Sequence, residues 1–123
     1  MRIKIDFNSQ EAIYQQLRNQ IVMAIAQNEL QNGDSLPSVR SLAQELGVNL
    51  HTVNKAYSIL RQEGYLILER RRGAVVQVRI EEKNTEVCQI NDHMQLIVAQ
   101  AICKDISKEE MYQIIDQMYS SFE

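Results

Sequence analysis

Two amphipathic stretches joined by a very short connection constrain this chain more than any other feature. Apolar side chains recur at helical spacing in residues 38–46 and 50–63, as Val39, Leu42, Ala43 and Leu46 and then as Val53, Ala56, Tyr57 and Leu60. Pro37 favours a helix start at its position, Gly47 favours a left-handed helix end, and Asn49 is a strong N-cap for the next helix. Two helices with so short a turn between them predict a helix-turn-helix.

A further helix is expected before this pair. Asn8 and Ser9 can accept hydrogen bonds from the free amides of a helix that runs to about residue 28. Its apolar stripe contains Ile13, Tyr14, Leu17, Ile21, Ala24 and Ile25. The alternating segment IKIDF at residues 3–7 predicts a short strand at most.

Two β-type runs follow the helices. Gly64 is expected to end the third helix, and residues 65–69 and 74–80 are rich in apolar and β-branched side chains. A turn through Arg70–Gly73 joins these runs. Three helices followed by a hairpin predict a winged helix-turn-helix domain over residues 1–80.

The third helix carries hydrogen-bonding groups on the side away from its apolar stripe. Asn54 can pair bidentately with adenine, and His51 and Thr52 can donate or accept hydrogen bonds at base edges in a major groove. Lys55 suits a phosphate. No carboxylate, which DNA would repel, lies between residues 46 and 62. Each residue taken alone is also an ordinary solvated helix position, and a zinc site at His51 lacks a second ligand at helical spacing.

Three consecutive arginines occupy the expected turn of the hairpin. Arg70, Arg71 and Arg72 repel one another unless an anion binds them or solvent screens them. A narrow minor groove and its flanking phosphates attract such side chains. The alternative is a turn that only aids solubility. Together with the third helix, the arginines favour DNA as the partner.

Charge is divided unevenly along the chain, whose 123 residues carry a net charge of −3. Residues 1–79 contain ten Lys and Arg against seven Asp and Glu, a net +3, whereas residues 80–123 contain three against nine, a net −6. This division of charge is consistent with a polyanion binding to residues 1–79 and not to residues 80–123. With no export signal, no apolar run long enough for a bilayer and only two cysteines, the protein is expected in the cytoplasm, away from membranes.

Other classes of function find less support in the sequence. An enzyme needs a nucleophile–base pair, a phosphate-binding loop or metal-spaced ligands, and the nearest approach is the scattered set Cys88, His93 and Cys103. We therefore expect no catalytic residue, no metal and no cofactor. A winged helix that binds another protein instead of DNA remains an alternative, as does a redox role for the cysteines.

Several segments resemble one known family. The DNA-binding domain of the GntR family of bacterial transcription regulators is closely similar to IYQQLRNQI at 13–21, NELQNGDSLPSVRSLAQELGVNLHTVNKAYSILRQEGYL at 28–66 and RRRG at 70–73. The most diagnostic pieces are G-D-x-L-P-S-x-R, L-A-x-x-L-G-V and T-V-x-x-A-Y followed by E-G. This resemblance implies DNA contacts from Arg40, Asn49, His51, Thr52, Asn54, Arg70, Arg72 and Gly73. Leu50 and Arg71 depart from the family, which often has arginine and glycine at these positions.

The tail, residues 81–123, predicts a helical hairpin for dimerisation. Asn91 and Asp92 are expected to cap a helix that ends near residue 105, and Ser107–Glu110 is a capping box for a second helix. The stripes expected to pair two subunits contain Met94, Ile97, Ile102, Met111, Ile114, Ile115, Met118, Tyr119 and Phe122. Packing of this tail on the N-terminal domain is the alternative. The expected fold class is mainly α (α+β), a winged helix-turn-helix with a C-terminal helical hairpin.

So short a tail looks like the YtrA-type branch of the family. Resemblance to that branch implies a homodimer that binds double-stranded operator DNA and represses operons encoding ABC transporters. A two-fold dimer reads two inverted half-sites, which multiplies the discrimination of one recognition helix. No particular small-molecule effector is implied.

Overall fold

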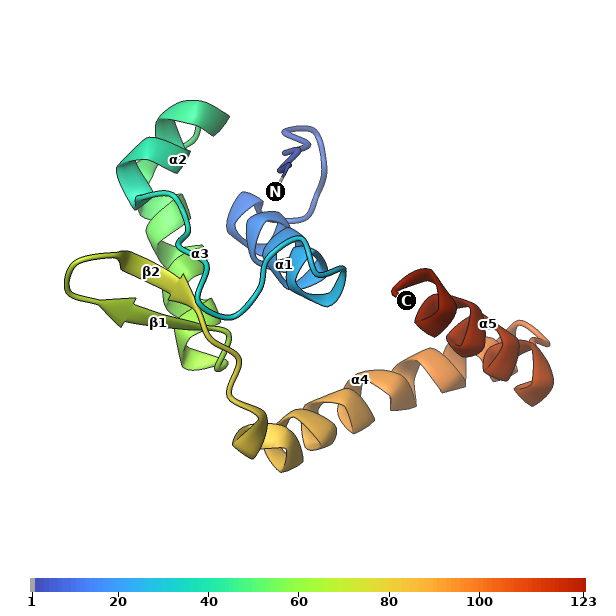
Figure 1. The fold of residues 1–123 in the computed structure, drawn as a ribbon. Helices are drawn as coiled ribbons and strands as arrows, with labels where there is room; N and C mark the ends of the chain where they lie inside the picture. Colours follow the sequence, from blue (N-terminus) through green and yellow to red (C-terminus); the bar gives the residue numbers. More distant parts are fainter. Residues whose placement is uncertain (1) are drawn as a thin grey trace. The chain divides into compact units, whose positions relative to one another are not determined.

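The computed structural model describes residues 2–123, and the chain divides into two compact units, Met1–Arg79 and Ile80–Glu123 (Figure 1). In chain order the elements are α1 (Ile13–Ala26), α2 (Val39–Leu46), α3 (Leu50–Gln62), β1 (Leu66–Glu69), β2 (Gly73–Val76), the short 3₁₀ helix η1 (Ile80–Glu82), α4 (Lys83–Cys103) and α5 (Lys108–Ser121). The predicted fold class, mainly helical with one small antiparallel hairpin, is confirmed.

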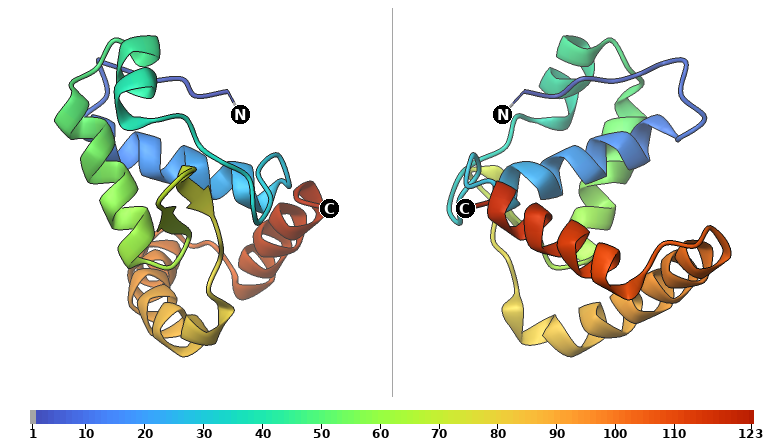
Figure 2. Two further views of the ribbon diagram at one scale, coloured as in Figure 1. Left: turned by 60° about the vertical axis from the view of Figure 1, so that its left-hand side comes forward. Right: turned by 90° about the vertical axis from the view of Figure 1, so that its right-hand side faces the viewer.

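The helix α3 lies at the centre of the first unit. Both α1 and α2 pack against α3, and β1 packs against it as well (Figures 1 and 2). The core that these elements share contains Leu17, Ile21, Ala24, Leu30, Leu36, Leu42, Ala43, Val53, Ala56, Tyr57, Leu60, Leu66 and Val76. Full burial of one large aliphatic side chain contributes about 1.5–3 kcal/mol. One flank of α3 is therefore fixed in the core, and the other stays outside it.

Local capping fixes the corner between α2 and α3. The Ser38 hydroxyl accepts a hydrogen bond from a first-turn amide at 3.0 Å, so Ser38 is the cap and Pro37 lies directly before it, next to the predicted helix start. Gly47 closes α2 with a left-handed φ of 68°, and the Asn49 side chain caps α3 by accepting from a first-turn amide at 2.8 Å. The predictions for Gly47 and Asn49 are confirmed.

The N-terminal segment does not form the short strand expected at residues 3–7. Glutamine side chains of α1 take the place of a strand partner. The Asp6 amide donates to Gln16 Oε1 at 2.9 Å, and Gln16 Nε2 donates back to the Asp6 carbonyl at 3.0 Å. Gln20 forms the same reciprocal pair with the backbone of Lys4. These side-chain amides satisfy the extended backbone without a second strand.

The first helix is shorter at both ends than the sequence predicts. The Ser9 hydroxyl accepts from the Glu11 amide at 3.0 Å, which closes a local turn ahead of the helix. Ala12 then occupies the cap position without a side-chain hydrogen bond. The helix ends at Ala26, because Asn28 adopts a positive φ of 62° that no right-handed helix can contain.

The hairpin that follows α3 is antiparallel, with Glu69 opposite Gly73. Its second strand ends at Val76, short of the predicted residue 80. Backbone pairing continues just beyond it, because the Gln77 amide donates to the Tyr65 carbonyl at 2.9 Å. The Val78 amide faces the other way and donates to the Asn32 side chain at 3.0 Å.

The second unit begins its long helix earlier than predicted. α4 starts at Lys83, so Asn91 and Asp92 lie inside the helix and do not cap it. Val87 and Ile90 continue the three-and-four spacing of the later apolar residues toward the N-terminus, and no glycine or proline interrupts that segment. Continuous periodicity here overrides the preference of Asn and Asp for cap positions.

The helix α5 starts as predicted, at a capping box. The Ser107 hydroxyl accepts from the Glu110 amide at 3.1 Å, and the Glu110 carboxylate accepts from the Ser107 amide at 3.5 Å. The chain reverses direction between α4 and α5 (Figure 2). Of the residues in these two helices, all of which the structure describes, Ala101 alone is buried. The helical hairpin predicted for the tail therefore has no hydrophobic core of its own within one subunit.

Candidate nucleic-acid interface

One flank of α3 is exposed along the length of the helix. His51 and Asn54 are exposed and Thr52 is half-buried, whereas the opposite flank buries Val53, Ala56, Tyr57 and Leu60. Within the described residues, neither the His51 imidazole nor the Asn54 amide has an intramolecular hydrogen bond. Both side chains are therefore free to bind groups from outside the protein.

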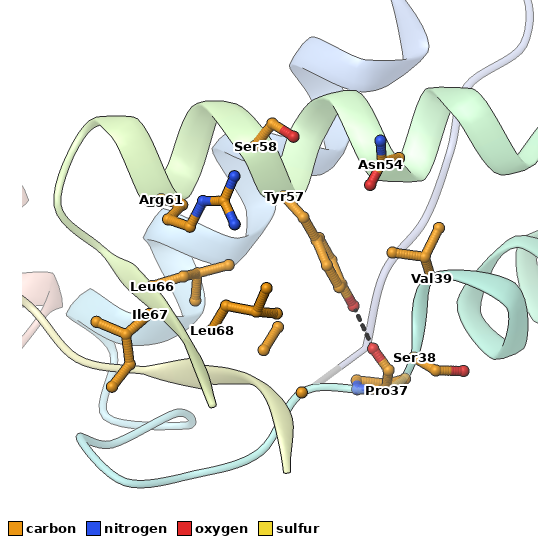
Figure 3. A pocket seen from close by; sticks show the side chains of 12 residues that line it. Pro37, Ser38, Val39, Asn54, Tyr57, Ser58, Arg61, Leu66, Ile67 and Leu68 are labelled. Atoms are coloured by element: carbon orange, nitrogen blue, oxygen red, sulfur yellow. Dashed lines mark hydrogen bonds between the residues drawn. The ribbon is translucent and has the colours of Figure 1, made fainter. Parts of the chain in front are cut away.

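Tyr57 anchors the buried flank of α3. Its hydroxyl donates a hydrogen bond of 2.8 Å to the Pro37 carbonyl (Figure 3). Burial raises the pKa of the Tyr57 phenol above its ordinary value, so the hydroxyl stays protonated and keeps donating. This bond ties α3 to the segment that enters α2.

Arg40 lies in the first turn of α2 and is exposed. Together with Leu50, His51 and Asn54 it lines a shallow hollow of about 440 Å³. The beginnings of α2 and α3 therefore share one surface, which brings Arg40 next to the base-reading candidates of α3.

Two of the predicted DNA-binding side chains already have partners in the free protein. Asn49 uses its side-chain oxygen to cap α3. The Lys55 ammonium lies 3.9 Å from the centre of the Tyr14 ring on α1, which is a cation–π contact. Both residues remain exposed. The structure thus gives Asn49 a structural role and holds Lys55 toward α1.

The turn of the hairpin, Arg70–Gly73, is called the wing below. Its three arginines are not equivalent. Arg70 and Arg71 are exposed, and within the described residues neither guanidinium has an intramolecular partner. Arg72 folds back instead, with its Nε donating to Ser35 Oγ at 3.1 Å and its Nη2 donating to the Gly33 carbonyl. Gly73 starts β2 with a φ of 72°, a left-handed conformation that favours glycine.

A second hollow, of about 340 Å³, lies between α3 and the two strands of the hairpin (Figure 3). Its lining includes Ser38, Asn54, Ser58, Arg61 and Gly73, with Tyr57, Leu66 and Ala74 among the apolar members. Ser58 and Arg61 were not selected from the sequence. They follow Asn54 at the i+4 and i+7 positions, so the same spacing that places the buried flank would have placed them on the exposed one.

The residues predicted to form a dimer lie on α4, on α5 and just after it. Met94, Met111, Ile115 and Phe122 are half-buried, whereas Ile97, Ile102, Ile114, Met118 and Tyr119 are exposed. Exposed fractions of 72% for Ile102 and 73% for Tyr119 leave large apolar surfaces uncovered. The free thiols of Cys88 and Cys103 are exposed as well.

Residues 2–123 contain no group of three His, Cys, Asp or Glu side chains arranged to hold a metal ion. No helix in this range is long and apolar enough to span a membrane.

Comparison with known proteins agrees with this geometry. The model of the family described as "Bacterial regulatory proteins, gntR family" matches residues 10–76. The uncharacterized HTH-type transcriptional regulator YhcF of Bacillus subtilis is 36% identical over 110 residues, which cover 85% of this chain and 88% of YhcF. The HTH-type transcriptional repressor YtrA of Bacillus subtilis is 29% identical over 118 residues, which cover 94% of this chain and 91% of YtrA.

Among solved structures, YtrA from Sulfolobus acidocaldarius, a GntR-family transcription factor, is 39% identical to this chain. The two superpose with a TM-score of 0.61, and the match covers 97% of each chain. The family model spans more than half of the sequence, and it includes α1, α2, α3 and the wing. The chain belongs to the GntR family of bacterial regulatory proteins and is a DNA-binding transcriptional regulator.

Proposed function

We propose that this regulator binds an inverted-repeat operator as a homodimer and acts as a repressor. In each subunit α3 enters the major groove, and the arginines of the wing lie at the adjacent minor groove. The observation that carries this proposal is the continuous surface from Arg40 through His51 and Asn54 to Arg61 and Gly73. A helix fits the major groove, and the width of a minor groove suits arginine side chains.

The contacts fall into two kinds. His51, Thr52 and Asn54 read base edges, because each offers hydrogen-bonding groups on the exposed side of α3. Arg40, Lys55 and the wing arginines bind phosphates or the minor groove, and these contacts position the protein on any duplex. Asn49 and Gly73 contribute backbone geometry at the two ends of this surface. The +3 charge of residues 1–79 favours the approach to DNA.

Dimerisation through the second unit is supported by its uncovered apolar stripes. Val87, Ile90, Met94 and Ile97 follow one another at spacings of three and four residues, which is the spacing of a coiled-coil seam. Apolar surface of this extent on a helical pair marks a protein interface. The tail's −6 charge does not weaken DNA binding if the tail stays clear of the duplex.

Similarity to YtrA supports repression and suggests the target genes. The YtrA relative is named a transcriptional repressor, and the short-tailed branch implies control of an ABC transporter operon. A protein with this task works in the cytoplasm, where the chromosome is. No catalytic step and no cofactor is needed for it.

The proposal is tested by selection from random duplex DNA followed by fluorescence anisotropy. We expect an enriched inverted repeat, bound by two subunits, with affinity that falls steeply as salt increases because counterions are released from phosphates. Failure to enrich any sequence, or binding that does not depend on salt, would reject the proposal. A fusion of the selected operator to a reporter promoter then shows repression directly.

A further inference from the structure

Leu50 is an apolar side chain in polar surroundings. It is the first residue of α3, it is 38% exposed, and it does not belong to the hydrophobic core cluster. Among residues 24–67, all of which the structure describes, it is the one large hydrophobic side chain that stays exposed. A single exposed leucine is ordinary on a protein surface. The position of this one gives it a specific role.

Its neighbours place Leu50 inside the candidate interface. Leu50 and Arg40 line two adjoining hollows, one shared with His51 and Asn54 and another of about 220 Å³ shared with Ala43, Gln44 and Val48. A duplex edge that reaches Arg40, His51 and Asn54 together must also meet the Leu50 side chain.

The chemistry of the major groove leaves one suitable contact for this side chain. Residues at the N-terminal end of a recognition helix are the ones that reach base edges. Most groups on those edges are hydrogen-bond donors or acceptors, and covering them with leucine would leave them without partners. The exception is the C5-methyl group of thymine, which is apolar.

We propose that Leu50 is a specificity-determining residue that packs on a thymine methyl group in each operator half-site. This inference rests on the proposed binding of α3 in the major groove. It predicts a thymine at a defined position beside the bases that His51 and Asn54 contact. Removal of one buried methyl group should lower affinity about fourfold per half-site, from the usual free energy of burying one such group.

The test uses the full-length protein and the operator selected from random DNA. Each thymine of a half-site is replaced in turn by 2′-deoxyuridine, which lacks the methyl group and keeps the hydrogen-bonding edge. For the wild type, affinity should fall about fourfold at one thymine when one half-site is changed, and about fifteenfold when both are changed. In Leu50→Ala, the same replacement should have no further effect, because the contact is already lost.

Two control variants separate this contact from a general effect of the mutation. Leu50→Met keeps an apolar side chain of similar size and should retain the deoxyuridine penalty. Met23→Ala removes another exposed hydrophobic side chain, on α1, and should bind like the wild type. Equal thermal melting temperatures of the variants show that they fold.

Three results overturn the inference. The first is a wild-type affinity that deoxyuridine leaves unchanged at every thymine. The second is a loss of affinity on deoxyuridine replacement that persists in Leu50→Ala. The third is a selected half-site without thymine. If the wild type binds its operator specifically but shows no methyl effect, only the role of Leu50 is rejected. If the wild type binds no duplex DNA at all, the proposed function is rejected.

Discussion

The Arg72 guanidinium ties the wing to the segment that enters α2, through a hydrogen bond of 3.1 Å from its Nε to Ser35 Oγ. The same group donates to the Gly33 carbonyl and lies 3.9 Å from the Glu69 carboxylate. Arg71, one residue earlier, has no such partner within the described residues. The two adjacent arginines therefore differ in the unbound protein, because Arg72 has intramolecular partners and Arg71 remains free within residues 2–123.

This difference predicts distinct effects for two alanine variants. Arg71→Ala and Arg72→Ala should each weaken binding to all duplex DNA and reduce the slope of log affinity against log salt by about one, because each removes one phosphate-binding cation. Arg72→Ala should also speed amide hydrogen exchange at Leu36, whose amide donates to the Ala74 carbonyl at 2.9 Å beside this junction.

Exchange at Leu36 in Arg71→Ala should match the wild type and serves as the control. Unchanged salt slopes in both variants would contradict the role of the wing. Equal exchange rates at Leu36 in the two variants would contradict the tethering role of Arg72.

Asn54→Ala tests base reading by α3. Because a bidentate contact to one base is lost, affinity for the selected operator should fall by about 1–3 kcal/mol, with little change for random duplex DNA. Titrations of both duplexes by anisotropy at one salt concentration measure this difference. Gln10→Ala, an exposed polar change outside α3, should leave both affinities unchanged. Equal losses on the two duplexes would show that Asn54 binds the backbone and not a base.

The double variant Ile115→Asp with Phe122→Asp tests the tail as the dimer interface. Two charges placed in an apolar interface remain unpaired, so the variant should be a monomer. Light scattering measures its mass in solution. Gln113→Asp adds a charge at an exposed position of the same helix and should remain a dimer. A dimeric mass for the double variant would exclude this interface.

Tyr57→Phe tests the anchor of α3. Loss of the 2.8 Å hydrogen bond to the Pro37 carbonyl should lower the free energy of unfolding by about 1 kcal/mol near pH 7. The pKa of the Tyr57 phenol is raised in the folded protein, whereas the unfolded phenol ionises near pH 10. The unfolded state therefore loses this proton first, and stability falls as pH rises above about 10.

Urea unfolding at about pH 8 and about pH 11 measures the effect. The wild type should lose more stability between these two pH values than Tyr57→Phe, because only the wild type has this titrating phenol. Equal losses would show that Tyr57 is not the group responsible.

Local signals in the sequence were sufficient wherever structure depends on neighbouring residues. Gly47 closes α2, Asn49 caps α3, and Ser107 with Glu110 starts α5, all as predicted. Each depends on the conformation of one residue or on a hydrogen bond within one helical turn. The exposed flank of α3 was predictable for the same reason, since helical periodicity assigns the two sides.

Features that depend on distant residues could not be predicted in this way. The backbone of residues 3–7 looked like a strand, but Gln16 and Gln20 of α1 supply its hydrogen-bond partners. In the sequence Arg72 is indistinguishable from Arg70 and Arg71. Its hydrogen bond to Ser35, 37 residues earlier, depends on how the hairpin packs in the folded protein.

The sequence by itself determined the helix-turn-helix, the exposed flank of α3 and the family of this protein, because those follow from periodicity, capping and short motifs. Only the tertiary structure decided which of the predicted side chains are free in the unbound protein. It paired Lys55 with Tyr14, tied Arg72 to Ser35 and left Leu50 exposed beside Arg40. The physical reason is that a side chain's partner is set by which elements pack together, and spacing along one element carries no information about that.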